Sequence, residues 1–117
     1  MRSGVVDFIS VEWLTLPDAA DRLDVPVTRV RQLIRDHRLL AERRDGVLYI
    51  PADFIVDGQI LKGLAGLLTL LLDARFEDDE ALRWLFTEDP SLPGTPVQAL
   101  TENRGREIHR RAQALAF

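Results

Sequence analysis

The chain has 117 residues, of which 46% are hydrophobic and 29% charged, and its 15 basic and 19 acidic side chains give a formal net charge of −4. This composition is typical of a folded globular protein, and the length allows one domain or two very small ones. Cysteine is absent, which excludes disulfides, thiolate nucleophiles and cysteine-bound metals.

Residues 16–35 are predicted to form two short helices joined by a tight turn. Pro17 suits the first turn of a helix, and Asp24 suits the left-handed residue of the turn, because Asp tolerates that conformation better than most residues. Pro26 then starts the second helix, predicted over 27–37. The apolar face of this helix has residues three and four positions apart, namely Val27, Val30, Leu33 and Ile34. Two helices that pack in this way form a helix-turn-helix.

Residues 40–50 are predicted to form a hairpin. Two short strands flank Asp45 and Gly46, which together are the strongest two-residue hairpin signal. A lone hairpin is only marginally stable in water, so this one is expected to pack against the helices. A helix-turn-helix followed by such a hairpin is a winged helix-turn-helix, here with a two-stranded wing. After Pro51, residues 52–55 are predicted to make a short helical turn.

The chain after Gly58 is predicted to be helical. The segment 60–76 is apolar nearly all round, which indicates a buried central helix. Its longest apolar run, 64–72, is about half of what a bilayer span requires, and no secretory signal is visible at the N-terminus. We therefore expect a cytoplasmic protein without a membrane partner. Three more helices are predicted, over 79–86 with Asp78 as the cap, over 96–103 with Thr95 as the cap, and over 106–117.

These elements predict a mainly α protein. A winged helix-turn-helix over 12–56, with its two-stranded hairpin wing, is followed by a C-terminal helical bundle over 57–117 that packs on it. Neither half is large, so we expect the two to share one core. The last helix is expected to dock on the helix at 64–74 through a stripe of small and apolar residues, namely Ile108, Ala112, Leu115, Ala116 and Phe117.

Positive charge is concentrated in one stretch of this acidic chain. Residues 29–44 hold six arginines against one Asp and one Glu, so they carry a charge of +4 and the rest of the chain carries −8. Charge runs usually form a solvated face, and a preference for arginine also fits a GC-rich genome. Here, however, the arginines fall on the outer face of the second helix and on the hairpin. A winged helix-turn-helix presents these two elements to the major groove and to the flanking backbone of DNA.

We therefore predict a DNA-binding protein and transcriptional regulator, with the helix at 27–37 in the major groove and the wing at 40–50 on the backbone of a double-stranded DNA partner. Guanidinium groups neutralise phosphates and also pair with guanine O6 and N7, and an amide such as that of Gln32 pairs with adenine. The candidate DNA-binding residues are Thr28, Arg29, Arg31, Gln32, Arg35, Arg38, Arg43 and Arg44.

Other polar motifs have structural explanations. The acidic run at 77–80 lacks the ligand spacing of a calcium loop and suits the N-terminus of a helix. His37 and His109 have no partner at a spacing that suggests catalysis, and Gly63 and Gly66 match no phosphate-binding loop, so helix packing is the better account of them. We expect no enzymatic activity, no metal and no cofactor.

Two stretches also carry family resemblances. Residues 14–55 resemble the winged helix-turn-helix of the MerR and excisionase group. The sequence "ALRWLFTEDPSLPGTPVQAL" (81–100) resembles the core of the C-terminal domain of Xre/ParS-type antitoxins. Over nearly its whole length, through "VPVTRV", "GQILKGLAGLLTLL", "RWLFTEDPSL" and "RRAQALAF", the chain is similar to a small family of actinobacterial DNA-binding regulatory proteins whose mycobacterial member is a Ser/Thr-kinase substrate. The resemblance implies DNA binding through the winged half.

A rival hypothesis is an interaction module, antitoxin-like or an adaptor, whose C-terminal half binds a protein partner. It requires that the leucines at 67, 68, 71 and 72 are not all covered within the chain and form an apolar patch. On oligomeric state, the sequence has no sustained heptad repeat and its last helix is short. We therefore expect a monomer in solution, with dimers as the alternative and any pairing induced on DNA.

Overall fold

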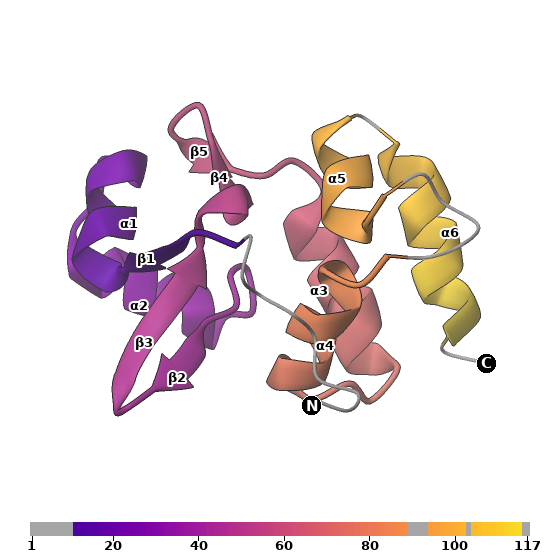
Figure 1. The fold of residues 1–117 in the computed structure, drawn as a ribbon, viewed down its shortest axis with the longest axis horizontal. Helices are drawn as coiled ribbons and strands as arrows, with labels where there is room; N and C mark the ends of the chain where they lie inside the picture. The colour runs from indigo at the N-terminus through magenta and orange to yellow at the C-terminus, as the bar shows by residue number, and fades with distance from the viewer. Residues whose placement is uncertain (1–10, 89–93, 103, 116–117) are drawn as a thin grey trace.

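The computed structural model describes residues 11–88, 94–102 and 104–115. Figure 1 shows the helix-turn-helix and its sheet at one end of the longest axis and the remaining helices at the other, so the mainly α fold class is confirmed. The elements in chain order are β1 (Trp13–Thr15), α1 (Leu16–Leu23), α2 (Val27–Arg35), β2 (Glu42–Arg44), β3 (Val47–Pro51), a 3₁₀ turn (Ala52–Phe54), β4 (Ile55–Val56), β5 (Gln59–Ile60), α3 (Leu64–Asp73), α4 (Asp78–Leu85), α5 (Pro96–Thr101) and α6 (Gly105–Leu115).

The helix-turn-helix forms as predicted. The Thr15 hydroxyl caps α1 by accepting the Asp18 N–H at 3.2 Å. Asp24 has φ 59° and ψ 48°, the left-handed conformation expected of it, and its N–H donates to carbonyls in the last turn of α1. The chain turns at that point and re-enters a helix after Pro26.

The second helix is two residues shorter than the predicted 27–37. It ends at Arg35, and His37 has φ 58°, so the chain leaves the helix axis there. The N–H of Arg38 donates to the Leu33 carbonyl at 2.9 Å and closes this end of the helix. The reversal turns Leu39 and Leu40 into the core, where both are fully buried. Arg38 therefore follows the helix and is not part of it.

The predicted two-stranded hairpin wing forms from β2 and β3, and a third strand that was not predicted extends it into a three-stranded sheet. Asp45 and Gly46, with φ 51° and 81°, form the predicted tight turn between β2 and β3. The strand β1 pairs antiparallel with the other side of β3, giving the order β1-β3-β2. At three residues β1 is too short to produce a recognisable alternation in the sequence. β2 begins at Glu42, two residues after the predicted start, because the preceding residues are held in the core.

A second hairpin joins the two halves and was not predicted. The 3₁₀ turn confirms the short helical turn expected after Pro51. Asp57 and Gly58, with φ 52° and 77°, then connect β4 to β5. Of their residues, Ile55 was predicted to belong to the short helical turn and Ile60 to the central helix, and the others were assigned to no element. As a result α3 begins at Leu64, after Gly63 at φ 87°, and not at residue 60.

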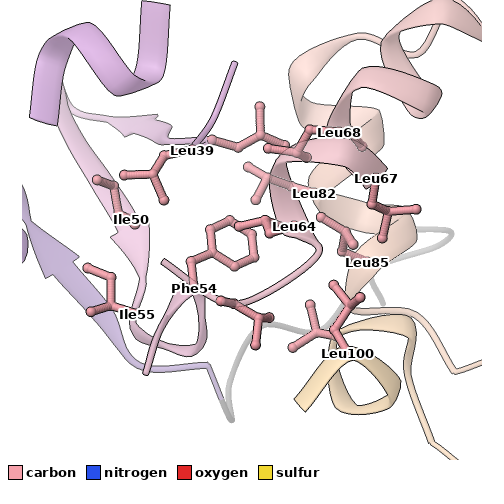
Figure 2. Close-up of a cluster of buried hydrophobic side chains, with 14 of the residues drawn as sticks. Leu39, Ile50, Phe54, Ile55, Leu64, Leu67, Leu68, Leu82, Leu85 and Leu100 are labelled. Atoms are coloured by element: carbon pink, nitrogen blue, oxygen red, sulfur yellow. The ribbon is translucent and has the colours of Figure 1, made fainter. Parts of the chain in front are cut away.

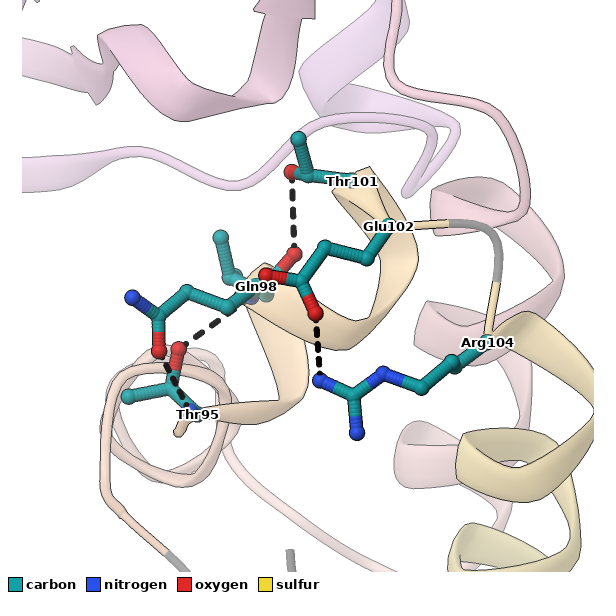
Figure 3. Close-up of polar contacts among 6 residues, drawn as sticks. Thr95, Gln98, Thr101, Glu102 and Arg104 are labelled. Carbon is teal, nitrogen blue, oxygen red and sulfur yellow. Dashed lines mark hydrogen bonds and ion pairs between the residues drawn. The ribbon is translucent and has the colours of Figure 1, made fainter. Parts of the chain in front are cut away.

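The C-terminal helices have clear N-terminal caps. Glu77, rather than the predicted Asp78, caps α4, and it forms a capping box with Glu80. Thr95 caps α5 as predicted: its hydroxyl accepts the Gln98 N–H at 3.2 Å, and the Gln98 side chain accepts the Thr95 N–H at 2.8 Å (Figure 3). Pro96 lies in the first turn of α5, where a missing N–H leaves no hydrogen bond unmade.

One apolar core joins both halves. Figure 2 shows Leu39, Ile50 and Phe54 of the winged half facing Leu64, Leu68 and Leu82 of the helical half. The ring centroids of Phe54 and Phe86 lie 5.9 Å apart across this boundary. The shared core is therefore confirmed, whereas the division of the chain into 12–56 and 57–117 stays a prediction.

The central helix is covered within the chain. Leu67, Leu68 and Leu71 are fully buried, and Leu72 is half-buried. The last helix, α6, lies beside α3 and buries Ile108 and Ala112, as predicted. Leu115 departs from the prediction because 43% of its surface is exposed. The remaining members of the predicted stripe, Ala116 and Phe117, lie outside the described residues.

Candidate nucleic-acid interface

The outer face of α2 is polar and exposed along its whole length. Only Val30 and Leu33 of this nine-residue helix are buried. Because these residues are three apart, they lie on one side of the helix and the positions between them point to solvent. The exposed positions include five predicted site residues, namely Thr28, Arg29, Arg31, Gln32 and Arg35.

The arginines of this face form no ion pair with any other described residue. Elsewhere in the described part of the chain arginines pair with acids: Arg83 with Asp79 at 3.4 Å, and Arg104 with Glu102 at 2.7 Å (Figure 3). Among the same described residues, Arg29, Arg31 and Arg35 form no ion pair. The outer face of α2 is therefore a surface of uncompensated positive charge.

The two wing arginines are held in different ways. Arg43 donates from Nη1 to the carbonyl of Gly46 at 3.2 Å, which fixes its side chain beside the turn. Arg44 pairs with Glu42 on the same strand, and its guanidinium lies 4.3 Å from the centre of the Trp13 ring. A cation over an indole face is attracted by the ring quadrupole. The position of Arg44 is therefore set by two neighbours before any ligand is bound.

The helix and the wing meet along a groove of about 300 Å³. Arg31 of α2 and Arg43 of β2 both line it, together with Thr15, Pro17 and Val47. The structure thus brings together two cations that are twelve positions apart in sequence. Both belong to elements that a winged helix-turn-helix presents to a duplex.

Arg38 lies apart from this groove. With Asp36 and His37 it lines a separate hollow of about 430 Å³, whose other wall is formed by Ala65, Gly66 and Thr69 of α3. Its place is thus at the junction of the two halves, because the helix has already ended at Arg35. Of the predicted set, the structure groups Arg31 and Arg43 and separates Arg38.

Two residues near the site were missed by sequence reasoning. Trp13 supports Arg44, and Thr15 both caps α1 and lines the groove. Both lie in β1, whose three residues gave no strand signal. Trp13 is one of only two tryptophans in the chain, and an aromatic residue beside a basic wing was the available clue.

The described residues contain no group of three or more His, Asp or Glu side chains that could hold a metal ion. No helix among them is long and apolar enough to cross a membrane.

Comparisons with known proteins agree over both halves of the chain. Residues 6–55 match the family model described as "DNA-binding protein Rv2175c, wHTH domain", and residues 61–116 match "Rv2175c C-terminal domain of unknown function". The chain is 45% identical over 115 residues to "DNA-binding protein Rv2175c" of Mycobacterium tuberculosis, a match that covers 87% of this chain and 79% of the relative.

A solved structure gives the same result. The chain resembles the "NMR structure of Rv2175c" with a TM-score of 0.85 and 41% sequence identity, over 98% of this chain and 87% of that one. At this identity and coverage the likeness shows a shared family as well as a shared fold. The protein therefore belongs to the Rv2175c family of winged helix-turn-helix proteins.

Proposed function

We propose that this protein binds double-stranded DNA, with α2 in the major groove and the β2–β3 wing on the backbone, and that it acts as a transcriptional regulator without enzymatic activity. The observation that carries the proposal is the groove lined by both Arg31 and Arg43 beside a helix face of uncompensated arginines. The printed name of its mycobacterial relative, a DNA-binding protein, supports it.

The positions of the side chains suggest a division of roles. Arg31 and Gln32 lie near the middle of the outer face of α2, where a recognition helix reaches base edges. Arg29 and Arg35, with Arg43 and Arg44 of the wing, are assigned to phosphates. Arg38, which follows the helix, is assigned to a flanking phosphate and to no base.

Net negative charge does not oppose this function. The chain carries −4 overall, but charges separated by more than about 8 Å are largely screened at physiological salt. A duplex against α2 therefore experiences chiefly the nearby arginines. The distant acids weaken non-specific binding, which favours a protein that selects sites over one that coats DNA.

Salt dependence is the direct test. Each phosphate neutralised releases counterions, so the five phosphate contacts assigned above give a slope of about −4.5 in a plot of log affinity against log salt, or roughly a 500-fold loss between 50 and 200 mM. Fluorescence anisotropy with duplexes selected from a random pool measures it. Arg83→Gln, an exposed arginine on α4, is the control and should leave the slope unchanged. A flat salt response, or no selected duplex, would overturn the proposal.

The remaining assignments follow from DNA binding. A bacterial protein that binds DNA acts where the chromosome lies, so we infer a cytoplasmic location. The protein-interaction alternative depended on exposed leucines of the central helix, and the burial of Leu67, Leu68 and Leu71 counts against it. The likeness to the MerR, excisionase and antitoxin groups stays a prediction.

A further inference from the structure

A further hollow lies in the helical half, away from the wing. It is a cleft of about 780 Å³ between the start of α3, the end of α5 and one face of α6. Its lining comes entirely from residues 62–113. Figure 1 shows α6 at the opposite end of the longest axis from the helix-turn-helix and its sheet. The cleft is thus separate from the groove between α2 and the wing.

Three cationic side chains line the cleft. They are Lys62, which is the chain's single lysine, Arg106 and Arg110, and His109 and Gln113 add polar groups to the lining. No acidic side chain of the described residues contributes to the lining. This is unexpected in a protein with 19 acidic residues and a net charge of −4.

Arginines beside the cleft pair with acids, whereas, within the described part of the chain, the cations that line it do not. Next to it, Arg104 pairs with Glu102, and Arg111 pairs with Glu107 at 3.1 Å. In the described residues, Lys62, Arg106 and Arg110 form no ion pair. Thus α6 directs its paired arginine away from the cleft and its uncompensated ones into it.

The positive charges of Arg106 and Arg110 repel each other. Arg106 and Arg110 are four residues apart on α6, where like charges repel and destabilise a helix. Neither is required for packing, because both are exposed. A pair that disfavours the free helix is explained if an anion sits between the two guanidinium groups.

Two glycines in the first turn of α3 or just before it allow the helices around the cleft to pack closely. A Cβ on Gly63, which has φ 87°, would lie 3.2 Å from Leu100, and one on Gly66 would lie 3.1 Å from the His109 ring. The absent side chains let α5 and α6 approach the start of α3. His109 Nε2 lies 3.3 Å from the Gly63 carbonyl, which holds the ring in the lining of the cleft. The expected helix-packing role of these glycines thus shapes the cleft.

We propose that this cleft binds a small phosphorylated molecule of about nucleotide size. A volume of about 780 Å³ falls within the roughly 300–1,000 Å³ of typical small-molecule sites. Three cations around one concavity suit a ligand with two or more negative charges, and guanidinium groups match the geometry of phosphate oxygens. A concave site at the far end from the winged half suits a small molecule better than a second stretch of duplex.

Isothermal titration calorimetry of the full chain with inorganic pyrophosphate and with ATP, both without magnesium, tests the proposal. Both compounds should bind, and adenosine, which has no phosphate, should bind at least about tenfold more weakly. The double variant Arg106→Gln and Arg110→Gln should lower affinity about tenfold or more, since each removes a charged hydrogen-bond donor. Arg83→Gln, an exposed arginine on α4 outside the cleft, is the matched control and should bind like the parent.

Thermal melting of each variant checks folding, and Lys62→Gln, which lies outside the helices, provides a second loss-of-binding variant if the double variant does not fold. The proposal is overturned if neither pyrophosphate nor ATP binds at millimolar concentration, or if all variants bind them equally. It is also overturned if the cleft variants lose affinity only for duplex DNA, because the cleft would then be a backbone contact. Failure here leaves DNA binding by α2 untouched, since that is measured separately.

Discussion

Helices α2 and α3 are nearly equal in length, nine and ten residues, but they use their surfaces in opposite ways. Only Val30 and Leu33 of α2 are buried, and its other side is a row of polar and cationic groups. In α3 four leucines are buried, namely Leu64, Leu67, Leu68 and Leu71. The buried side chains of α3 therefore hold the two halves together, whereas the exposed polar side chains of α2 are available to bind a ligand.

This difference separates stability from recognition. Changes to the buried side of α3 should unfold the protein, and changes to the outer side of α2 should leave folding intact and weaken DNA binding. Three predictions test that separation and a fourth tests the oligomeric state, in order from the largest expected effect to the smallest.

Leu68→Ala should destabilise the protein by about 2–5 kcal/mol, since the lost methyl groups leave a cavity that the core fills only in part. Leu68 is fully buried at the boundary between the two halves, near Leu39 and Leu82 (Figure 2). Urea denaturation measures the free energy of unfolding. On the exposed side of the same helix, Thr69→Ala is the control and should cost less than about 1 kcal/mol. A loss as small as that of the control would show that the two halves do not depend on this contact.

Much of the fold behind this prediction is visible in the sequence. The apolar run of the central helix, the Asp45-Gly46 turn and the Thr95 cap were all identified because each follows from a local rule of periodicity or conformation. The elements that were missed, β1 and the β4–β5 hairpin, have strands of two or three residues. Their pairing depends on contacts with distant segments, and so few residues cannot display an alternating pattern.

Arg31→Ala should weaken binding to the selected duplex by about 1–3 kcal/mol and relax specificity at one base pair, if Arg31 reads a base edge. Its side chain is exposed and unpaired, so thermal stability should change by less than about 0.5 kcal/mol. Anisotropy with the selected duplex and its single-base variants measures both affinity and specificity. An equal loss of affinity on every duplex would show that Arg31 contacts phosphate. An unchanged affinity would show that the outer face of α2 is a solvated surface that does not contact DNA.

Arg44→Ala should have a smaller and mixed effect. Because its guanidinium lies over Trp13 and beside Glu42, its loss should cost about 0.5–1 kcal/mol of stability through the cation–π contact. Affinity should fall evenly across sequences, and the salt slope should become shallower by about 1. Urea denaturation and a salt titration separate the two effects. Trp13→Leu should reproduce the stability loss; an Arg44→Ala chain that loses affinity for one sequence alone would contradict the phosphate assignment.

The candidate site was only partly predictable for a related reason. The arginines of α2 could be identified from helical periodicity and charge. The meeting of Arg31 with Arg43 depends on how the wing folds back on α2, and the removal of Arg38 from the helix depends on the left-handed conformation of His37. Neither follows from a local pattern, since both reflect the burial of Leu39 and Leu40.

Leu115→Asp should have almost no effect, and it tests whether α6 serves the chain itself or a second copy. The sequence suggested that Leu115 docks on the central helix, but 43% of its surface is exposed, so it is the one large apolar side chain on α6 that solvent reaches among the described residues. A single leucine is too small a patch to hold a dimer, because stable interfaces bury roughly 800 Å² on each partner. Sedimentation at tens of micromolar should therefore show a monomer for the parent and for the variant. If the parent instead sediments as a dimer and Leu115→Asp dissociates it, α6 is an interface between copies, and DNA binding by paired α2 helices becomes the better description.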